Sequence, residues 1–155
     1  MNLFGVMDVS ASALKAERVR AEVVAANMAN AETTRTAEGG PYQRHHVVFE
    51  AGGAGSFAQA LAGSMGSGVR SDFASSRGVA GGVSVTSVIS DASEPLRRYD
   101  PGHPDAGADG YVAYPDINPL TEMVDLMGAT RSYGMNASAV QAEKNMVASS
   151  LELLK

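Results

Sequence analysis

The most enzyme-like motif of the chain is the glycine-rich stretch Gly53-Ala54-Gly55-Ser56-Phe57-Ala58. It follows a strand-like segment, opens a possible short helix at 57–61, and is followed by Asp72 at about the 20-residue distance that dinucleotide-binding fingerprints require. Such a fingerprint also needs a helix of several turns and a second buried parallel strand that carries the acid to the ribose. Residues 64–72 are rich in Gly and Ser instead. A small nucleotide-binding enzyme is therefore the weaker interpretation.

The histidines offer little for metal chemistry. His45 and His46 are adjacent on a presumed strand, so their side chains point to opposite faces and cannot easily bind one metal ion. His103 lies near Asp100 and Asp105 in a proline-rich turn, and three such groups could in principle hold a cation. A hydrogen bond within the turn is the favoured role for His103. No metal site is predicted.

Nucleophilic catalysis is not indicated either. Ser64 lacks the first glycine of a nucleophile elbow and has no buried strand before it. The methionines of the C-terminal region could form an adaptable peptide-binding face, but Met at helical spacing more often fills a core or an interface. We therefore predict no catalytic or cofactor-binding residue, no cofactor and no small-molecule substrate.

Charge and composition narrow the possible partners. Twelve Lys and Arg against seventeen Asp and Glu give a net charge of −5 over 155 residues, so the surface lacks the positive charge that binds phosphate backbones. Nucleic acid is not an expected partner. Cysteine is absent, which excludes disulfides and thiolate metal sites. The N-terminus has no basic region and Asp8 interrupts it early, so no cleavable signal peptide is expected, and no apolar run is long enough for a membrane span.

A long helix is predicted from Phe4 to Asn30. Helix formers dominate this stretch, and after Gly5 it contains neither Pro nor Gly. Its apolar residues recur at alternating spacings of three and four, which is the pattern of a helix with one apolar seam. Arg18 breaks the series, and its methylenes could lie along a partner while its charge stays in water. The seam positions are Phe4, Met7, Ala11, Leu14, Ala21, Ala25 and Met28.

A second long helix is predicted to start at Asn118-Pro119. Asn118 is a suitable cap, Pro119 fits the first turn because its missing N–H costs nothing there, and Glu122 suits the positive helix start. Gly134 is the weak point within this helix. Thr130 and Lys144 interrupt a heptad series that otherwise continues the apolar seam through Met123, Leu126, Tyr133, Ala137, Val140, Val147, Leu151 and Leu154.

The middle of the chain is predicted to form a small β-rich region. Residues 42–50 are β-branched and aromatic, and 82–89 alternate apolar with polar residues as a half-buried strand does. Shorter strands are predicted at 96–99 and 110–114, on either side of the turn Asp100-Pro101-Gly102-His103-Pro104. Residues 51–82 are rich in Gly, Ala and Ser and are predicted to be flexible apart from the short helix at 57–61.

The two apolar seams must be buried against another surface. Most helical stability in proteins comes from packing the apolar face, and the two terminal helices can cover each other. Two such seams nevertheless bury little area compared with the entropy of ordering some 60 residues, at about 1–2 kcal/mol each for the backbone. Copies packed side by side would supply the missing stability. An ordinary helical hairpin on a small domain explains the periodicity equally well.

Specific residues favour the assembly interpretation. The stretch from Ser12 to Arg20, followed by Ala26-Asn27-Met28-Ala29-Asn30-Ala31-Glu32-Thr33, resembles the first helix and its Asn-Leu-Ala-Asn-Ala-like end in flagellar rod and hook axial proteins. Met28 stands in place of the usual Leu. Similarity to the proximal rod members of that family continues at Gly40–Arg44, Val47–Phe49, Tyr99–Pro104, Gly110–Val112, Glu122–Val124 and Ala129–Tyr133.

The resemblance implies a structural subunit of the flagellar rod. The fold it implies is α+β, with a coiled-coil-like polymerising layer made of residues 1–31 and 118–155 and an outer β-rich region at 32–117. Asn27 and Asn30 would bond backbone groups locally, end the first helix and direct the departing chain. The predicted assembly interface is Phe4, Met7, Leu14, Met28, Met123, Leu126, Tyr133, Val140, Val147, Leu151 and Leu154.

The resemblance also implies partners and a location. The partners would be copies of the chain, other rod proteins, the membrane-anchored ring of the basal body and the flagellar type III export apparatus, which would export the chain without a cleavable signal. The location would be the rod that spans the periplasm. Another flagellar axial subunit remains an alternative. The Gly/Ala/Ser-rich segment is poorly matched to the family pattern.

Overall fold

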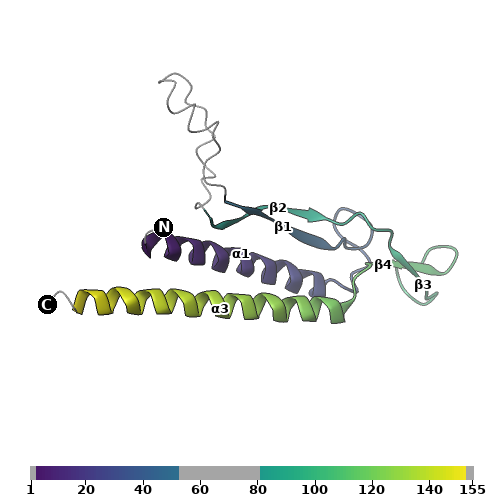
Figure 1. Ribbon diagram of the computed structural model, residues 1–155. Helices are drawn as coiled ribbons and strands as arrows, with labels where there is room; N and C mark the ends of the chain where they lie inside the picture. The colour runs from purple at the N-terminus through teal and green to yellow at the C-terminus, as the bar shows by residue number, and fades with distance from the viewer. Residues whose placement is uncertain (1–2, 53–80, 153–155) are drawn as a thin grey trace, which may run out of the picture. The chain divides into compact units, whose positions relative to one another are not determined.

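The computed structural model describes residues 3–52 and 81–152 (Figure 1). The predicted α+β class, with a long helix at each end and short strands between, is confirmed. The predicted helix at 57–61, the glycine-rich stretch from Gly53 with Asp72, Ser64 and Leu154 lie outside the described residues. The elements in chain order are α1 (Leu3–Ala29), β1 (His45–Ala51), β2 (Val83–Ser90), β3 (Leu96–Tyr99), β4 (Tyr111–Tyr114) and α3 (Pro119–Glu152).

The chain divides into two compact units. The first unit comprises 1–17, 49–86 and 132–155, and the second comprises 18–48 and 87–131. Each unit contains part of α1 and part of α3, so each has its own helix pair. Among the described residues few apolar side chains are buried: Ala16 in the first unit, and Val24, Val112, Ile117 and Ala129 in the second.

Helix α1 ends through bonds made by Asn30. The Asn30 N–H donates to the carbonyls of Ala26 (3.1 Å) and Asn27 (3.2 Å), and the Asn30 side-chain amide donates to the Ala26 carbonyl at 2.9 Å. The Thr33 hydroxyl then donates to the Asn30 side-chain oxygen at 3.1 Å. The carbonyls of Ala26 and Asn27, in the last turn of the helix, thereby find donors from outside the helix. The Asn30 side chain thus bonds the backbone locally, and its role in directing the departing chain stays a prediction.

Helix α3 starts as predicted. The Leu120 N–H donates to the Asn118 side-chain oxygen at 3.0 Å, and the Glu122 N–H donates to the Asn118 carbonyl at 3.1 Å, which is the first helical hydrogen bond. The helix continues through Gly134 without a break. Within the described ranges, neither helix has the combination of length and apolar character that a membrane span requires.

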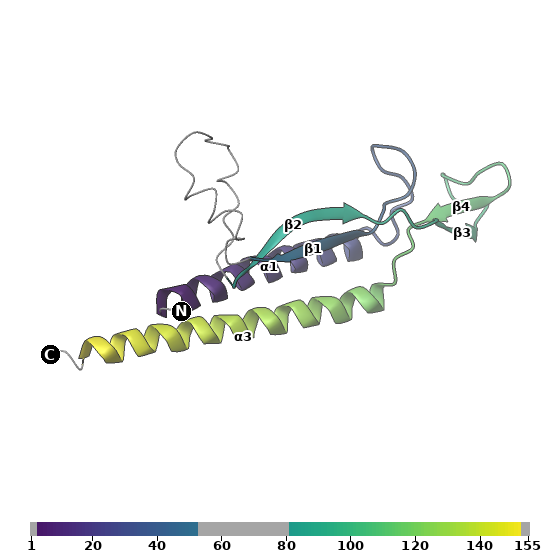
Figure 2. The same ribbon diagram turned by 45° about the horizontal axis from the view of Figure 1, so that its top comes forward.

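The strands form two separate two-stranded sheets. The Gly52 N–H donates to the Gly82 carbonyl at one end of the β1–β2 pair, and the Asp91 N–H donates to the Arg44 carbonyl at the other, so these strands run antiparallel. Figure 2 shows β3 and β4 as a second ribbon, also antiparallel, with Leu96 opposite Tyr114 and Tyr99 opposite Tyr111. The predicted strands at 82–89 and 96–99 agree with β2 and β3 to within one residue.

Gly110 shortens the predicted strand 110–114 by one residue. Its φ of +75° lies in the left-handed region, and a Cβ there would meet Tyr99 Cε2 at 2.9 Å. The Tyr99 ring packs edge-on against Tyr111, with 5.3 Å between the ring centroids. The turn before β4 thus needs a residue without a side chain at this position.

Gly110→Ala is expected to lower the free energy of unfolding by about 1–2 kcal/mol, because alanine is strained at positive φ and crowds Tyr99. Urea denaturation followed by circular dichroism measures this change. The matched control is Gly128→Ala in α3, where nothing lies within 4 Å of the added Cβ. That substitution should raise stability by up to about 1 kcal/mol through helix propensity. Equal effects of the two alanines would contradict this account of Gly110.

Candidate assembly site

Asn27 is the hub of a buried polar network in the second unit. Only 1% of the residue is exposed. Its side-chain amide donates to the His45 carbonyl (2.9 Å) and to Glu122 Oε2 (3.2 Å), and its side-chain oxygen accepts from the His45 N–H (2.9 Å) and the Tyr42 hydroxyl (3.2 Å). These four bonds use the full hydrogen-bonding capacity of an asparagine side chain. The two backbone bonds to His45 also fix which end of the amide is oxygen and which is nitrogen.

This arrangement corrects the prediction for Asn27. The sequence predicted local bonds that help to end the first helix, but Asn27 lies inside α1 and its side chain bonds to β1 and α3. A local cap was plausible because Asn commonly serves as one. Burial decides the outcome here, since a buried amide needs partners and His45 and Glu122 provide them.

Glu122 links the hub to a buried ion pair. The residue is 1% exposed, and its Oε1 accepts from Arg44 Nε at 2.7 Å and lies 2.5 Å from Arg44 Nη2. Asp125 lies one turn further along α3. Its Oδ2 is 3.8 Å from Arg44 Nη2, and its Oδ1 is 3.6 Å from Arg20 Nη2. The start of α3 is therefore tied to α1 and to the residue just before β1. Glu122 also lies in the first turn of α3, where the helix dipole favours a negative charge.

Tyr42 and His45 complete the network. The Tyr42 hydroxyl lies 2.8 Å from His45 Nδ1, and the two ring centroids are 5.2 Å apart. Because the hydroxyl proton goes to Asn27, His45 Nδ1 must be the donor of this bond. Burial, assisted by the negative charge of Glu122, raises the pKa of Tyr42. Both causes penalise the ionised tyrosine.

This raised pKa predicts a loss of stability in alkali. The folded chain keeps the Tyr42 proton at a pH where the unfolded chain has released it, so the contribution is complete below the ordinary tyrosine pKa of about 10 and is lost as the pH rises through the folded value. Urea denaturation between about pH 9 and pH 11 measures the slope. Tyr42→Phe should show a shallower decline, and an identical decline in the two proteins would contradict the assignment.

The loop after α1 returns directly to this network. The Tyr42 N–H donates to the Thr33 carbonyl at 3.0 Å and closes the loop, while Gly39 and Gly40 turn it with φ values of +90° and +82°. The Thr34 hydroxyl donates to Asp105 at 2.9 Å. Asp105 belongs to the turn between β3 and β4, which also contains His103. There His103 Nδ1 accepts the Asp105 N–H at 3.1 Å, so the turn hydrogen bond predicted for His103 is confirmed.

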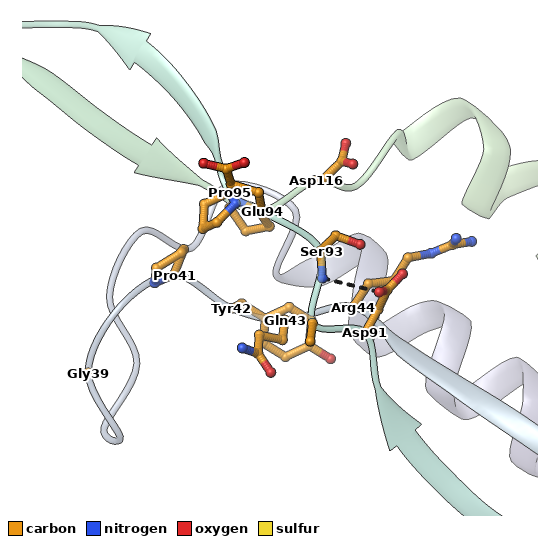
Figure 3. A pocket seen from close by; sticks show the side chains of 12 residues that line it. Gly39, Pro41, Tyr42, Gln43, Arg44, Asp91, Ser93, Glu94, Pro95 and Asp116 are labelled. Carbon is orange, nitrogen blue, oxygen red and sulfur yellow. Dashed lines mark hydrogen bonds between the residues drawn. The ribbon is translucent and has the colours of Figure 1, made fainter.

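A cavity of about 410 Å³ opens beside the network, between the loop at 39–44 and residues 91–95 (Figure 3). Four charged residues line it, namely Arg44, Asp91, Glu94 and Asp116, and the first two are engaged in structural bonds. Arg44 binds Glu122, and Asp91 accepts the Ser93 N–H at 3.1 Å and lies 3.4 Å from His46. Hydrogen bonding from Ser93 lowers the pKa of Asp91. Across the described ranges, no group of three or more histidine and carboxylate side chains could hold a metal ion.

The two helices meet through polar and small residues in each unit. In the first unit the Ser10 hydroxyl donates to Glu143 Oε1 at 3.3 Å, and both residues are buried. In the second unit Asn27 bonds Glu122, and Val24 and Ala129 are buried. Each of these residues lies one position before a position of the predicted heptad series, including the two positions where Thr130 and Lys144 interrupt it. The intramolecular contact stripe is therefore offset by one residue from the apolar seam.

The predicted interface residues consequently keep much of their surface. Four of them are exposed: Phe4 (69%), Met123 (52%), Tyr133 (44%) and Leu151 (61%). Leu120, Val124 and Met127 are exposed as well and extend the apolar surface at the start of α3. The remaining predicted residues in the described ranges are half-buried: Met7, Leu14, Met28, Leu126, Val140 and Val147.

The network around Asn27 was largely missed by sequence reasoning. Glu122 was noticed only as a favourable first-turn residue, and Tyr42, Arg44 and His45 were assigned to a strand. One signal was available in the sequence. Ser10, Arg20, Val24 and Asn27 share one face of the helix at heptad-compatible spacing, so a second, largely polar stripe runs beside the apolar seam.

Comparison with known proteins assigns the chain to a family. Residues 7–35 match the family described as "Flagella basal body rod protein", and residues 108–153 match "Flagellar basal body rod FlgEFG protein C-terminal". The flagellar basal-body rod protein FlgC of Bacillus subtilis is 42% identical over 159 aligned residues, which cover 100% of both chains. The chain belongs to the FlgC family. FlgC of Borreliella burgdorferi is 34% identical over 100% of this chain and 99% of the relative.

Membership of the FlgC family settles the general function. The FlgC protein of Salmonella typhimurium is also similar, at 34% identity over 99% of this chain and 98% of the relative. The chain is a structural subunit of the rod in the bacterial flagellar basal body. As a rod protein it assembles with other flagellar components. The predicted resemblance to axial proteins is confirmed.

Proposed function

We propose that the chain polymerises through the outward faces of its two terminal helices. The observation that carries this proposal is the distribution of side chains on α3. Glu122 and Glu143 are buried against α1, whereas Met123, Tyr133 and Leu151 are exposed. A helix that buries two carboxylates and leaves large apolar groups exposed gains little from standing alone in water, because burial of apolar surface is the dominant favourable term in association.

The partners of this surface are copies of the chain and other rod proteins. Family membership supports the wider context: the chain occupies the proximal rod, passes through the flagellar type III export apparatus without a cleavable signal, and contacts the membrane-anchored ring of the basal body. The rod then crosses the periplasm and carries torque. Closely packed helices suit that task, since interdigitated side chains at native packing density resist sliding.

The Asn27 network has a mechanical role in this proposal. In the second unit it joins α1, the start of β1 and the start of α3 through bonds to Asn27 and Glu122. Asn30 ends α1 three residues later and directs the chain into the loop. Together the two asparagines set the direction in which the outer β-rich region leaves the polymerising helices.

Cysteine protection tests the assembly surface. The natural chain contains no cysteine, so a single introduced thiol is the only one present. Met123→Cys and Tyr133→Cys should react with a maleimide in the purified chain and be protected in isolated basal bodies. Glu38→Cys, in the exposed loop after α1, is the control for general access of the reagent. Reaction at Met123→Cys and Tyr133→Cys in basal bodies as fast as in the free chain would exclude this surface from the interface.

A further inference from the structure

The only sulfur groups of the chain are thioethers, because it contains eight methionines and no cysteine. The described methionines fall into two classes. Met7 and Met28 on α1 are half-buried. The four on α3 are more than half exposed: Met123 (52%), Met127 (62%), Met135 (61%) and Met146 (53%). We call these four residues the exposed methionines; Met123 and Met127 lie in the second unit, and Met135 and Met146 lie in the first.

Other apolar residues are exposed beside these methionines. In the second unit Leu120 (70% exposed) and Val124 (59%) are neighbours of Met123 and Met127 along α3, and in the first unit Leu151 is exposed as well. The carboxylates that α3 buries are engaged with α1 instead: Glu122 bonds Asn27, and Glu143 bonds Ser10. Adding an oxygen to these thioethers would therefore place strong hydrogen-bond acceptors on the surface that the proposed function assigns to assembly.

We infer that the exposed methionines are oxidation sites of the unassembled subunit, and that their conversion to methionine sulfoxide blocks addition to the rod. The inference rests on the proposed function. The oxidant is hydrogen peroxide. The thioether sulfur attacks its terminal oxygen, the O–O bond breaks, a sulfur–oxygen bond forms, and the leaving hydroxide takes up the proton as water. Sulfur loses two electrons and the peroxide gains them.

Oxidation weakens assembly because of what the interface must bury. A thioether packs as a flexible apolar group, whereas a sulfoxide is polar and needs a donor. A buried acceptor without a donor lowers an association constant by about tenfold or more, so several sulfoxides in the assembly interface suffice to prevent addition. Conversely, assembly buries the same thioethers and thereby protects them from peroxide.

The first experiment measures the order of oxidation. The purified full chain is treated with hydrogen peroxide, and the sulfoxide at each methionine is followed by peptide mass spectrometry. Met123, Met127, Met135 and Met146 should be oxidised several-fold faster than Met7 and Met28, and urea should abolish the difference. Equal rates at all six residues in the folded chain would overturn the inference.

The second experiment measures assembly. Untreated and peroxide-treated chains are mixed with purified rod proteins, and the complexes are quantified by sedimentation. The treated chain should lose at least nine-tenths of its association, and a variant with Leu at all four positions should associate equally before and after treatment. Association of the untreated and treated natural chains to the same extent would overturn the inference alone. Failure of the untreated chain to associate would count against the proposed function, and the inference would fall with it, even if the measured order of oxidation were the expected one.

Discussion

Arg44→Ala is expected to lower the free energy of unfolding by about 2–3 kcal/mol, which is the largest stability effect that we predict for a single side chain. The substitution leaves Glu122, 1% exposed, without its cationic partner. Breaking a fully buried ion pair costs about 3–5 kcal/mol. The smaller figure applies here because the Arg44 side chain is 27% exposed, so water can reach part of the vacated space.

Two further variants make this prediction specific. Arg97→Ala removes the cation of the exposed Arg97–Asp109 pair, and such surface pairs contribute about 0–1 kcal/mol. Glu122→Gln in the Arg44→Ala background removes the orphaned charge but keeps an oxygen that can accept from Asn27, so it should restore part of the lost stability. Urea denaturation at neutral pH measures all three. Similar losses for Arg44→Ala and Arg97→Ala would contradict the buried network.

Leu151→Asp and Met123→Asp are expected to abolish swimming and rod incorporation while leaving the free chain folded. Both side chains are largely exposed, so aspartate meets water in the monomer. Inside an interface the same carboxylate would be desolvated without a partner, at a cost of several kcal/mol. Leu14→Asp should act similarly, although Leu14 is half-buried and its replacement also weakens the fold.

Motility in soft agar and the presence of the chain in isolated basal bodies measure these effects. Leu151→Met and Met123→Leu are the controls, because they preserve volume and apolar character and should support normal swimming. Circular dichroism of the purified aspartate variants checks that they are still folded. Normal motility with either Leu151→Asp or Met123→Asp would remove that residue from the assembly interface.

The elements of the fold were largely predictable because their signals are local. The first helix was predicted at Phe4–Asn30 and lies at Leu3–Ala29, and the second begins at Pro119, where its cap residue predicted it. The predicted strand at 42–50 begins three residues later than expected. Tyr42 is the reason: its N–H closes the loop to Thr33, and its hydroxyl reaches Asn27. Both bonds are made to partners that a local pattern cannot reveal.

The intramolecular contact stripe was the harder feature to predict. Heptad spacing shows that a helix has one apolar face, but it does not show which neighbour that face contacts. Helices α1 and α3 meet at Ser10, Asn27, Glu122 and Glu143 instead. A hydropathy pattern places such residues in solvent. They are buried because each finds a hydrogen-bond partner on the facing helix, which is a property of the tertiary structure.

The two bonds between Asn27 and the backbone of His45 also prevent α1 from turning about its own axis relative to β1. Moving the helix by one residue would rotate this side chain by about 100° and would leave both the N–H and the carbonyl of His45 unbonded. Aspartate would lose the two amide donors, and glutamine would be one methylene too long. Within the second unit, a torque on α1 is therefore transmitted directly to β1, because the helix cannot rotate independently of the strand.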